Sequence, residues 1–445
     1  MTALTAAAHS LARKARGRPR LANRLFYGWI MIPIAMLAMM CTAPAQTYGM
    51  SVFNPYLRES LGLSPGKLAL AYSLGTLLAC LPLTGVGGLM DRYGIRRTMA
   101  GIVVLFTGAC FLISQAMGWW SILLAFFCLR LFGQGSMMVV TLNTLPQWFN
   151  RRLGLAMAIF NIGVAGAIAF APQFHLWLIR EVGWRDAYIL LGIAISFVLL
   201  PLLIILFRNR PEDIGQRPDG VPVAQAPAND PEDAEEAEDD PAELSFTLGQ
   251  AVRTRAYWIM MADTAFDSLG KTAIAFSAVT LFTSRGMSAA EAALIFTIFG
   301  AVLAVARLVA GILADRLPLN LMLAAAATCM TLLMFSVWQA HTPWVVAMAG
   351  MFMGLQQGIK GAVDSTLWRR YYGRAHLGRI RGSFMTVLVA SGAVGPILFD
   401  GVYDLTGSYN KILAPLAFVP IPLIIAAFFA TRPKGHPQGA GTAPA

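Results

Sequence analysis

The chain has 445 residues, of which 57% are hydrophobic and 13% are charged, and its mean hydropathy is +0.61. Soluble proteins have about a quarter of their residues charged. This composition therefore excludes a soluble globular enzyme, a disordered chain and a disulfide scaffold. A helix that spans a bilayer needs about 20 apolar residues, and the chain is long enough for many of them. The composition predicts an all-α polytopic membrane protein.

Twelve apolar segments, taken in chain order, are long enough to cross a membrane. The first six are residues 27–52, 67–90, 98–118, 120–147, 152–179 and 186–207, and the second six are 256–283, 290–313, 318–338, 342–368, 379–402 and 409–431. The first segment follows a basic stretch and contains Ala43-Pro44-Ala45, a pattern that also occurs at the cleavage site of signal peptides. We favour an uncleaved span, because the apolar stretch continues past this site to Phe53.

The positive charges are distributed unevenly between the two sides of this arrangement. Of the 34 lysines and arginines, most lie in the N-terminal tail and in the loops on the same side as that tail. Six lie in the opposite loops (Arg58, Lys67, Arg180, Arg185, Arg285 and Lys411), and four lie within spans (Arg130, Lys271, Arg307 and Lys360). Positive charge accumulates in cytoplasmic loops, so we expect both termini in the cytoplasm and the protein in a plasma (inner) membrane. Topology thus accounts for the net charge of +11, and no nucleic acid partner is predicted.

An acidic segment divides the predicted spans into two sets of six. Residues 230–243 contain nine acidic and no basic side chains, a composition that cannot form a packed core. The predicted parts are therefore a basic cytoplasmic tail (1–25), a six-helix bundle (26–207), an acidic cytoplasmic linker (208–250), a second six-helix bundle (251–431) and a cytoplasmic tail (432–445). We interpret the linker as a tether, with a regulatory role as the alternative. Such a division is typical of duplicated transporters with a site between their halves.

A short motif occurs twice, six spans apart. The first copy, Gly87-Gly-Leu-Met-Asp91-Arg92-Tyr-Gly94-Ile-Arg96-Arg97, follows the second span, and Gly311-Ile-Leu-Ala-Asp315-Arg316 follows the eighth. The first copy resembles the signature loop of the major facilitator superfamily. The resemblance implies twelve transmembrane helices in two six-helix halves around a central cavity. It also implies a cytoplasmic gate latch, with topological anchoring as the alternative, formed by Gly87, Asp91, Arg92, Gly94, Arg96 and Arg97.

Within that superfamily, the chain resembles the monocarboxylate and oxalate/formate transporter branch. The resemblance is carried by Phe26-Tyr-Gly-Trp29, Gln46-Thr-Tyr-Gly49, Trp148-Phe-Asn-Arg151-Arg152, Gly183-Trp-Arg185, Arg210-Pro-Glu-Asp-Ile-Gly215 and Asp404-x-Thr-Gly407-x-Tyr409. Transporters of this branch bind the substrate carboxylate through an arginine in span eight, and Arg307 stands at the matching position. Leu388 stands where the oxalate carrier has a lysine, which disfavours a dicarboxylate such as oxalate.

Three charged residues lie four apart in span seven: Asp263, Asp267 and Lys271. This spacing places them on one helix face. Charges at mid-bilayer are costly, so they usually face a cavity and carry function. In the functional interpretation, Lys271 assists Arg307 in binding an anion and Asp267 is the proton-coupling candidate. The alternative is an Asp267–Lys271 ion pair that simply neutralises both groups.

Five further polar residues are weaker candidates for the cavity lining: Tyr48, Arg130, Asn143, Gln356 and Lys360. Hydrogen bonds between helices are the alternative for such residues. Arg130 begins a segment, Arg130-Leu-Phe-Gly-Gln134-Gly135, that resembles the superfamily's span-four arginine motif with the glutamine one residue late. Its role is either proton coupling or a structural charge pair. Lys360 lies four residues before Asp364, which favours an internal ion pair or a gate contact.

These observations predict a secondary active carrier of a small organic anion, a monocarboxylate, that works by alternating access with proton symport or anion exchange. Its expected partners are the anion, protons and the lipid bilayer, and we expect the monomer to be functional. No catalytic residues, cofactor or metal site are predicted, and the phosphate-binding loop of ATP-driven transporters is missing, so an enzyme is not expected. The alternatives are proton-driven drug efflux and a transporter-like membrane sensor.

Overall fold

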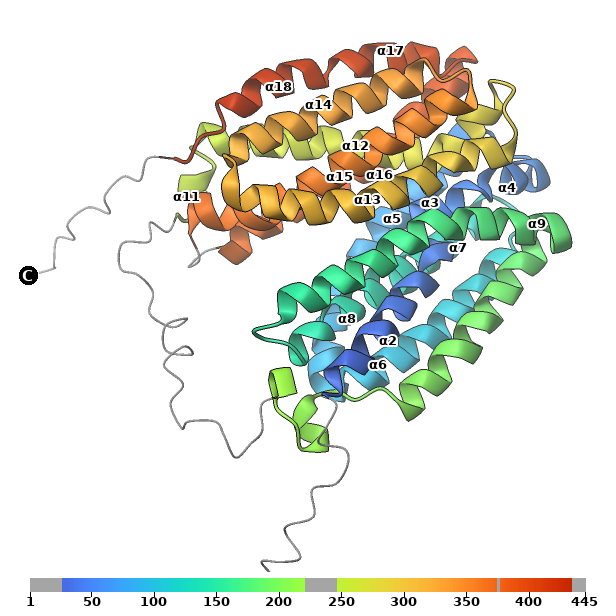
Figure 1. Cartoon of the computed structure of the whole chain (residues 1–445). Coiled ribbons are helices and arrows are strands. Elements are labelled where there is room, and N and C mark those ends of the chain that lie inside the picture. Colours follow the sequence, from blue (N-terminus) through green and yellow to red (C-terminus); the bar gives the residue numbers. More distant parts are fainter. Residues whose placement is uncertain (1–25, 221–245, 374–376, 434–445) are drawn as a thin grey trace, which may run out of the picture.

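The computed structural model describes residues 26–220, 246–373 and 377–433 (Figure 1). Within these ranges every regular element is a helix. The N-terminal tail, the acidic run at 230–243 and nearly all of the C-terminal tail lie outside the described residues. The structure therefore bears on the two predicted bundles and on the two ends of the linker.

The N-terminal helices occupy residues 28–205. They are α2 (Gly28–Cys41), η2 (Ala43–Ala45), α3 (Thr47–Ser51), α4 (Asn54–Leu61), α5 (Pro65–Cys80), α6 (Leu83–Ser114), α7 (Trp119–Cys128), η3 (Leu129–Met137), α8 (Met138–Leu142), η4 (Leu145–Gln147) and α9 (Leu153–Ile205). The first span is interrupted at η2, because Pro44 has no backbone N–H to donate and its ring disturbs a continuous helix.

The remaining helices form the linker ends and the C-terminal group. Two short turns, η5 (Pro211–Ile214) and η6 (Pro218–Gly220), begin the linker. The C-terminal group is α11 (Leu248–Ala251), α12 (Arg255–Thr283), α13 (Ala289–Arg316), α14 (Leu319–Trp338), α15 (Pro343–Tyr372), α16 (Leu377–Thr406), α17 (Asn410–Phe418) and α18 (Pro420–Phe428). Figure 1 shows it, from yellow to red, beside the N-terminal group, from blue to green.

Two glycines break helices that are otherwise continuous. Gly94 in α6 has φ 79° and ψ 159°, and Gly183 in α9 has φ 81° and ψ 162°. Glycine adopts positive φ without the steric cost of a Cβ atom. Both breaks fall between predicted spans, after residues 90 and 179, so the turns are built by single glycines rather than by loops.

Within the residues that the structure describes, eight helical stretches are long and apolar enough to cross a membrane, by length and composition. One of them is α9, whose 53 residues contain two predicted spans on either side of Gly183. The other three predicted spans correspond to α5, which has 16 residues, and to α12 and α15, which carry the buried charges described below. The count of twelve remains a prediction, with which this pattern is consistent.

Large apolar side chains on the outside of the helices are exposed. Among them Val104 on α6, Phe197 on α9 and Val305 on α13 are 56%, 79% and 62% exposed. Water would oppose such broad apolar exposure, whereas lipid tails are as apolar as these side chains. The chain is therefore an integral membrane protein.

The two groups of helices are joined at the end of the molecule where α4 lies. The side-chain amide of Asn54 donates to the backbone oxygen of Phe276 at 2.7 Å, and the rings of Tyr72 and Phe276 lie 4.3 Å apart. One apolar cluster runs through both groups, whereas a second, around Trp368 near α11, contains C-terminal residues only. In Figure 1 the groups meet near α4 and diverge toward α11. The molecule is thus closed at the α4 end.

Candidate functional site

Two cavities lie between the helix groups, and each contains one arginine. The first, of about 600 Å³, is lined by α9, α13 and α15 and includes Arg307 and Asn161. The second, of about 370 Å³, is lined by α5, η3 and α8 on one side and α12 and α16 on the other, and includes Arg130. We name them the Arg307 cavity and the Arg130 cavity. Helical transporters bind their substrates at such repeat interfaces.

Arg307 connects the two groups of helices through a neutral partner. Its guanidinium donates to the side-chain oxygen of Asn161, which lies on α9. Within the described part of the chain, Asn161 is the polar side chain that Arg307 contacts. No carboxylate in that part compensates the positive charge of Arg307. Sequence reasoning missed Asn161, although an amide beside Phe160 in an apolar span is a recognisable signal.

Arg130 lies in the π-helix η3. The hydrogen bonds of a π-helix run from residue i to i+5, so each turn holds one residue more than an α-helical turn. Arg130 and Gln134, four residues apart, accordingly line the same cavity. The π-helix gives a physical reason why the glutamine can stand one residue late in this motif.

The partners of Arg130 are also neutral. Its guanidinium donates to the backbone oxygen of Ala45 at 3.3 Å and to Oγ1 of Thr47 at 3.5 Å, and it lies 5.0 Å from the ring centroid of Tyr72. The hydroxyls of Thr47 and Tyr72 are 2.7 Å apart. Leu388 faces this group across the Arg130 cavity. Within the described residues, Arg130 therefore makes no charge pair.

Lys271 and Asp267 form an ion pair on α12, as their spacing allows. Nζ of Lys271 lies 2.8 Å from Oδ2 of Asp267, and it also donates to the side-chain oxygen of Gln357. The amide of Gln356 donates to the other oxygen of Asp267 at 2.6 Å. Lys271 is not among the residues that line the two cavities, and its partners differ from the Asn161 partner of Arg307. The structure thus brings Lys271 together with Asp267 and not with Arg307.

Lys360 on α15 has two acidic partners. Its Nζ lies 2.7 Å from Asp364 on the same helix and 3.0 Å from Asp263 on α12. It also donates to the hydroxyl of Thr264 at 3.1 Å. The pair with Asp364 was predicted from spacing, whereas the bridge to Asp263 depends on how α12 and α15 are arranged in space.

Two of the weaker candidates, Asn143 and Tyr48, contact helix backbone and apolar side chains. The side-chain amide of Asn143 is exposed and donates to the backbone oxygen of Val139, one turn earlier, at 2.8 Å. Tyr48 packs against the apolar cluster that runs through both helix groups. Neither residue is among those that line the two cavities.

The gate motif lies on α6 at the end opposite to α4. Arg96 binds the C-terminal end of α9, with Nε 2.9 Å from the backbone oxygen of Leu203, and its backbone N–H donates to Asn209 at 2.8 Å. Arg92 lies 5.3 Å from the ring centroid of Tyr93. These contacts stay within the N-terminal group. The side chain of Asp91 lies outside the described part, and the latch remains a prediction.

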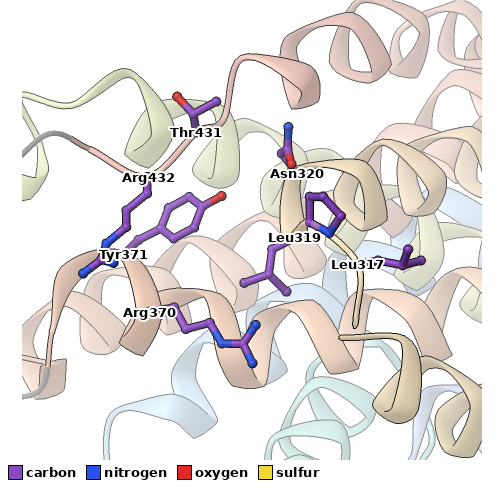
Figure 2. Close-up of a pocket in the computed structure, with 8 residues that line it drawn as sticks. Leu317, Leu319, Asn320, Arg370, Tyr371, Thr431 and Arg432 are labelled. Carbon is purple, nitrogen blue, oxygen red and sulfur yellow. The ribbon is translucent and has the colours of Figure 1, made fainter. Parts of the chain in front are cut away.

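A further cavity of about 500 Å³ lies within the C-terminal group, away from the boundary between the groups. Figure 2 shows Arg370 and Tyr371 at the end of α15, Asn320 at the start of α14 and Arg432 after α18 around it. The hydroxyl of Tyr371 donates to the backbone oxygen of Ala430 at 2.8 Å, which ties the chain after α18 to α15. Sequence reasoning did not predict this cavity. Among the described residues, no group of three or more His, Cys, Asp or Glu side chains is arranged to hold a metal ion.

Apolar helices in two groups, with a cavity between them, are the arrangement of helical membrane transporters. The family model of the Major Facilitator Superfamily matches residues 34–396 and 256–444. The chain belongs to the major facilitator superfamily.

Three curated relatives are similar to parts of the chain. The uncharacterized MFS-type transporter YhjX of Escherichia coli is 25% identical over 62% of this chain and 63% of its own length. A probable L-galactonate transporter of Escherichia coli is 31% identical over 36% of this chain and 35% of its own length. The oxalate:formate antiporter of Oxalobacter formigenes is 22% identical over 60% of this chain and 58% of its own length. The chain thus spans less than two thirds of each relative.

Among solved structures, the fold is similar to a bacterial homolog of the human lysosomal transporter Spinster in an inward-facing, unoccupied conformation. The TM-score is 0.61, with 15% sequence identity, over 91% of this chain and 92% of that one. This likeness concerns the fold alone. It matches the prediction of the major facilitator fold from the signature loop.

Proposed function

We propose that the chain is a secondary active carrier of a small organic anion, a monocarboxylate. It works by alternating access of its two bundles and is driven by proton symport or anion exchange. The observation that carries this proposal is the neutral surroundings of Arg307. The guanidinium of Arg307 is half-buried and has no acidic partner among the described residues, and it attracts an anion because burial of an uncompensated charge is costly.

The chemistry of the relatives supports an anion. Oxalate, formate and galactonate, named for two relatives, are all carboxylates. Each cavity offers one arginine, and Leu388 in the Arg130 cavity supplies no second cation. A single cationic anchor in each cavity suits one carboxylate group better than two, which favours a monocarboxylate.

The residue roles follow from position. Arg307 binds the carboxylate through the planar fork of its guanidinium, which matches carboxylate geometry. Lys271 assists from α12, because its partner Gln357 adjoins Gly358 in the lining of the Arg307 cavity. The sequence suggests Asp267 as the proton candidate, but Lys271 compensates its charge, and the neighbouring carboxyls of Asp263 and Asp364 are the alternative. Protons, the bilayer and a functional monomer complete the proposed partners.

The distribution of positive charge supports an orientation. The start of α2 and the gate motif on α6, with Arg96 and Arg97, lie at the end of the molecule away from α4 (Figure 1), and positive loops face the cytoplasm. We therefore place both termini in the cytoplasm of a cell with this protein in its plasma (inner) membrane. The α4 end faces outward, and the closed α4 end corresponds to an inward-open stage of the transport cycle.

The test is uptake by liposomes that contain the purified full chain. Labelled lactate, pyruvate, formate and oxalate are offered with and without an inward proton gradient, and with and without unlabelled anion inside. We expect uptake of at least one monocarboxylate, stimulated by the gradient or by internal anion, and little uptake of oxalate. Protein-free liposomes are the control. Absence of uptake for all four anions under every condition would contradict the proposal.

A further inference from the structure

The charged side chains between α12 and α15 contain one more carboxyl than ammonium. Asp267 pairs with Lys271 at 2.8 Å, and this pair is neutral. Asp263 and Asp364 both pair with Lys360, at 3.0 and 2.7 Å. When all groups are ionised, two carboxylates share one ammonium. The excess negative charge therefore belongs to Asp263, Lys360 and Asp364, which we call the Lys360 trio.

The Lys360 trio is withdrawn from water. The side chains of Lys360 and Asp263 are 4% and 9% exposed, and Phe384 on α16 covers Lys360 with its ring centroid 5.9 Å from Nζ. An uncompensated charge in such a place costs several kcal/mol. Oδ2 of Asp263 has the Lys360 ammonium as its partner, at 3.0 Å. The excess negative charge in a buried place therefore indicates that one proton belongs here.

We propose that Asp263 and Asp364 together hold the coupling proton, one on each side of the Lys360 ammonium. The proton bonds to one carboxylate oxygen of the pair, and Lys360 then pairs with the carboxylate that remains, so the trio becomes neutral. Loss of the proton to water restores the excess charge. Two carboxyls that interact this closely titrate as a pair. That this proton is coupled to an anion rests on the proposed function.

The position of the trio gives the proton an entrance. Asp364 is 24% exposed, against 9% for Asp263. Gly361 and Ser365, which line the Arg307 cavity, lie three residues before and one residue after Asp364 on α15. Residues three apart, as Gly361 and Asp364 are, lie next to each other on a helix surface. The proton therefore enters at Asp364, beside the cavity that receives the anion.

The charged groups around the trio make it responsive to the anion. On α12, Asp267 and Lys271 compensate each other, and on α13 Arg307 lines the same cavity as Gly361, which neighbours Asp364 on α15. An anion on Arg307 cancels that cation. A free arginine cation stabilises the ionised form of a nearby carboxyl group and so opposes its protonation. When an anion neutralises the arginine, this opposition is lost. Binding of the anion thus favours uptake of the proton.

The direct test is infrared spectroscopy of the full chain in lipid while the buffer is acidified, read at the band of protonated carboxyl groups. We expect the wild type to show a component of this band, the trio component, that Asp263→Asn and Asp364→Asn each remove, because either amide leaves Lys360 with one carboxylate. Both variants mimic the neutral trio and should fold. Lys360→Met should strengthen the trio component about twofold, since two carboxyls then lose their cation.

The controls separate this proton site from others. Glu181→Gln, at an exposed position on α9, should leave the trio component unchanged. A trio component that survives both Asp263→Asn and Asp364→Asn would overturn the proposal. So would its absence from the difference between wild type and variant, or its loss in Asp267→Asn alone.

Transport provides an independent readout. In liposomes, Asp263→Asn and Asp364→Asn should lose the stimulation of anion uptake by an inward proton gradient, whereas Glu181→Gln should keep it. Gradient-stimulated uptake in both variants would overturn the coupling role. If the wild type transports no anion, the proposed function fails, and the infrared result still decides whether the Lys360 trio binds a proton.

Discussion

The carboxylate of Asp404 accepts a hydrogen bond from the backbone N–H of Gly66 at 2.9 Å, across the boundary between the two bundles. The hydroxyl of Ser64, the N-cap of α5, donates to the same oxygen at 2.5 Å. A carboxylate at a helix N-terminus is stabilised by the unpaired backbone N–H groups there. Asp404 at the end of α16 therefore fastens α5 and helps to close the α4 end.

Removal of this carboxylate should open the α4 end. A side-chain cap contributes about 1 kcal/mol, so Asp404→Ala should shift the population toward structures that are open there. Spin labels at Glu59 and Lys411, both exposed, report the separation of the two bundles. We expect a longer component in their distance distribution. The same distribution in Asp404→Ala and in the wild type would rule out a role for this contact, and Asp186→Asn, at another exposed site, serves as the control.

Gly300 permits the closest approach of α13 to α9. A Cβ atom at this position would lie 2.4 Å from the backbone oxygen of Ala165 and 2.6 Å from the backbone nitrogen of Ala169. Both atoms belong to backbone, which cannot move aside easily. Gly300→Val should therefore prevent closure of the α4 end.

We expect Gly300→Val to fold, because the two bundles each keep their own packing, and to lose transport. The spin labels at Glu59 and Lys411 should show the long distance only. Gly108→Val, at an exposed position on α6 where a Cβ atom meets nothing within 4 Å, is the matched control. Transport by Gly300→Val at the wild-type rate would show that this approach is not needed in the cycle.

Single and double substitutions can distinguish a structural role of the Asp267–Lys271 pair from a role in transport. The two side chains are 7% and 14% exposed, and loss of one partner from a buried pair costs about 3–5 kcal/mol. Asp267→Asn and Lys271→Met should each lower the thermal stability, and the double variant should recover most of it. If Lys271 assists the substrate, transport stays low in the stable double variant. Full recovery of transport would assign the pair to structure alone.

Arg130 should contribute to transport through its charge. Arg130→Gln removes a cation whose partners in the described residues are neutral, and we expect a large loss of uptake without unfolding. Tyr72→Phe keeps the ring beneath the guanidinium and removes the hydroxyl that pairs with Thr47. A neutral hydrogen bond contributes about 1 kcal/mol, so its effect should be smaller. An equal loss in both variants would indicate that the hydroxyl pair, not the charge, matters.

Much of the fold could be predicted from composition and hydropathy. The apolar segments coincide with the helices because a spanning segment must satisfy its backbone hydrogen bonds internally, and this leaves few alternatives. The breaks at Gly94 and Gly183 fall between predicted spans, although local patterning gave no sign that single glycines would make them. The π-helix at Arg130 was not predicted either, since its extra residue per turn has no signature in the hydrophobic pattern.

The candidate site could be predicted only where it is local. Pairs four residues apart on one helix, such as Asp267–Lys271 and Lys360–Asp364, follow from helical geometry. The bridge from Lys360 to Asp263 and the contact of Arg307 with Asn161 join residues about 100 or more positions apart in the chain. Such contacts depend on how helices pack, which hydropathy does not specify.

The most direct test of the account is the uptake of a labelled monocarboxylate by liposomes containing Arg307→Gln. Loss of a charged hydrogen-bond donor costs about 1.5–3 kcal/mol, which corresponds to roughly ten- to hundredfold in affinity. We expect Arg307→Gln to lose gradient-stimulated uptake and exchange alike, and Arg307→Lys to keep part of both. Arg180→Gln, at an exposed position on α9, should behave as the wild type. Uptake by Arg307→Gln at the wild-type rate and affinity would contradict the central claim that Arg307 binds the transported anion.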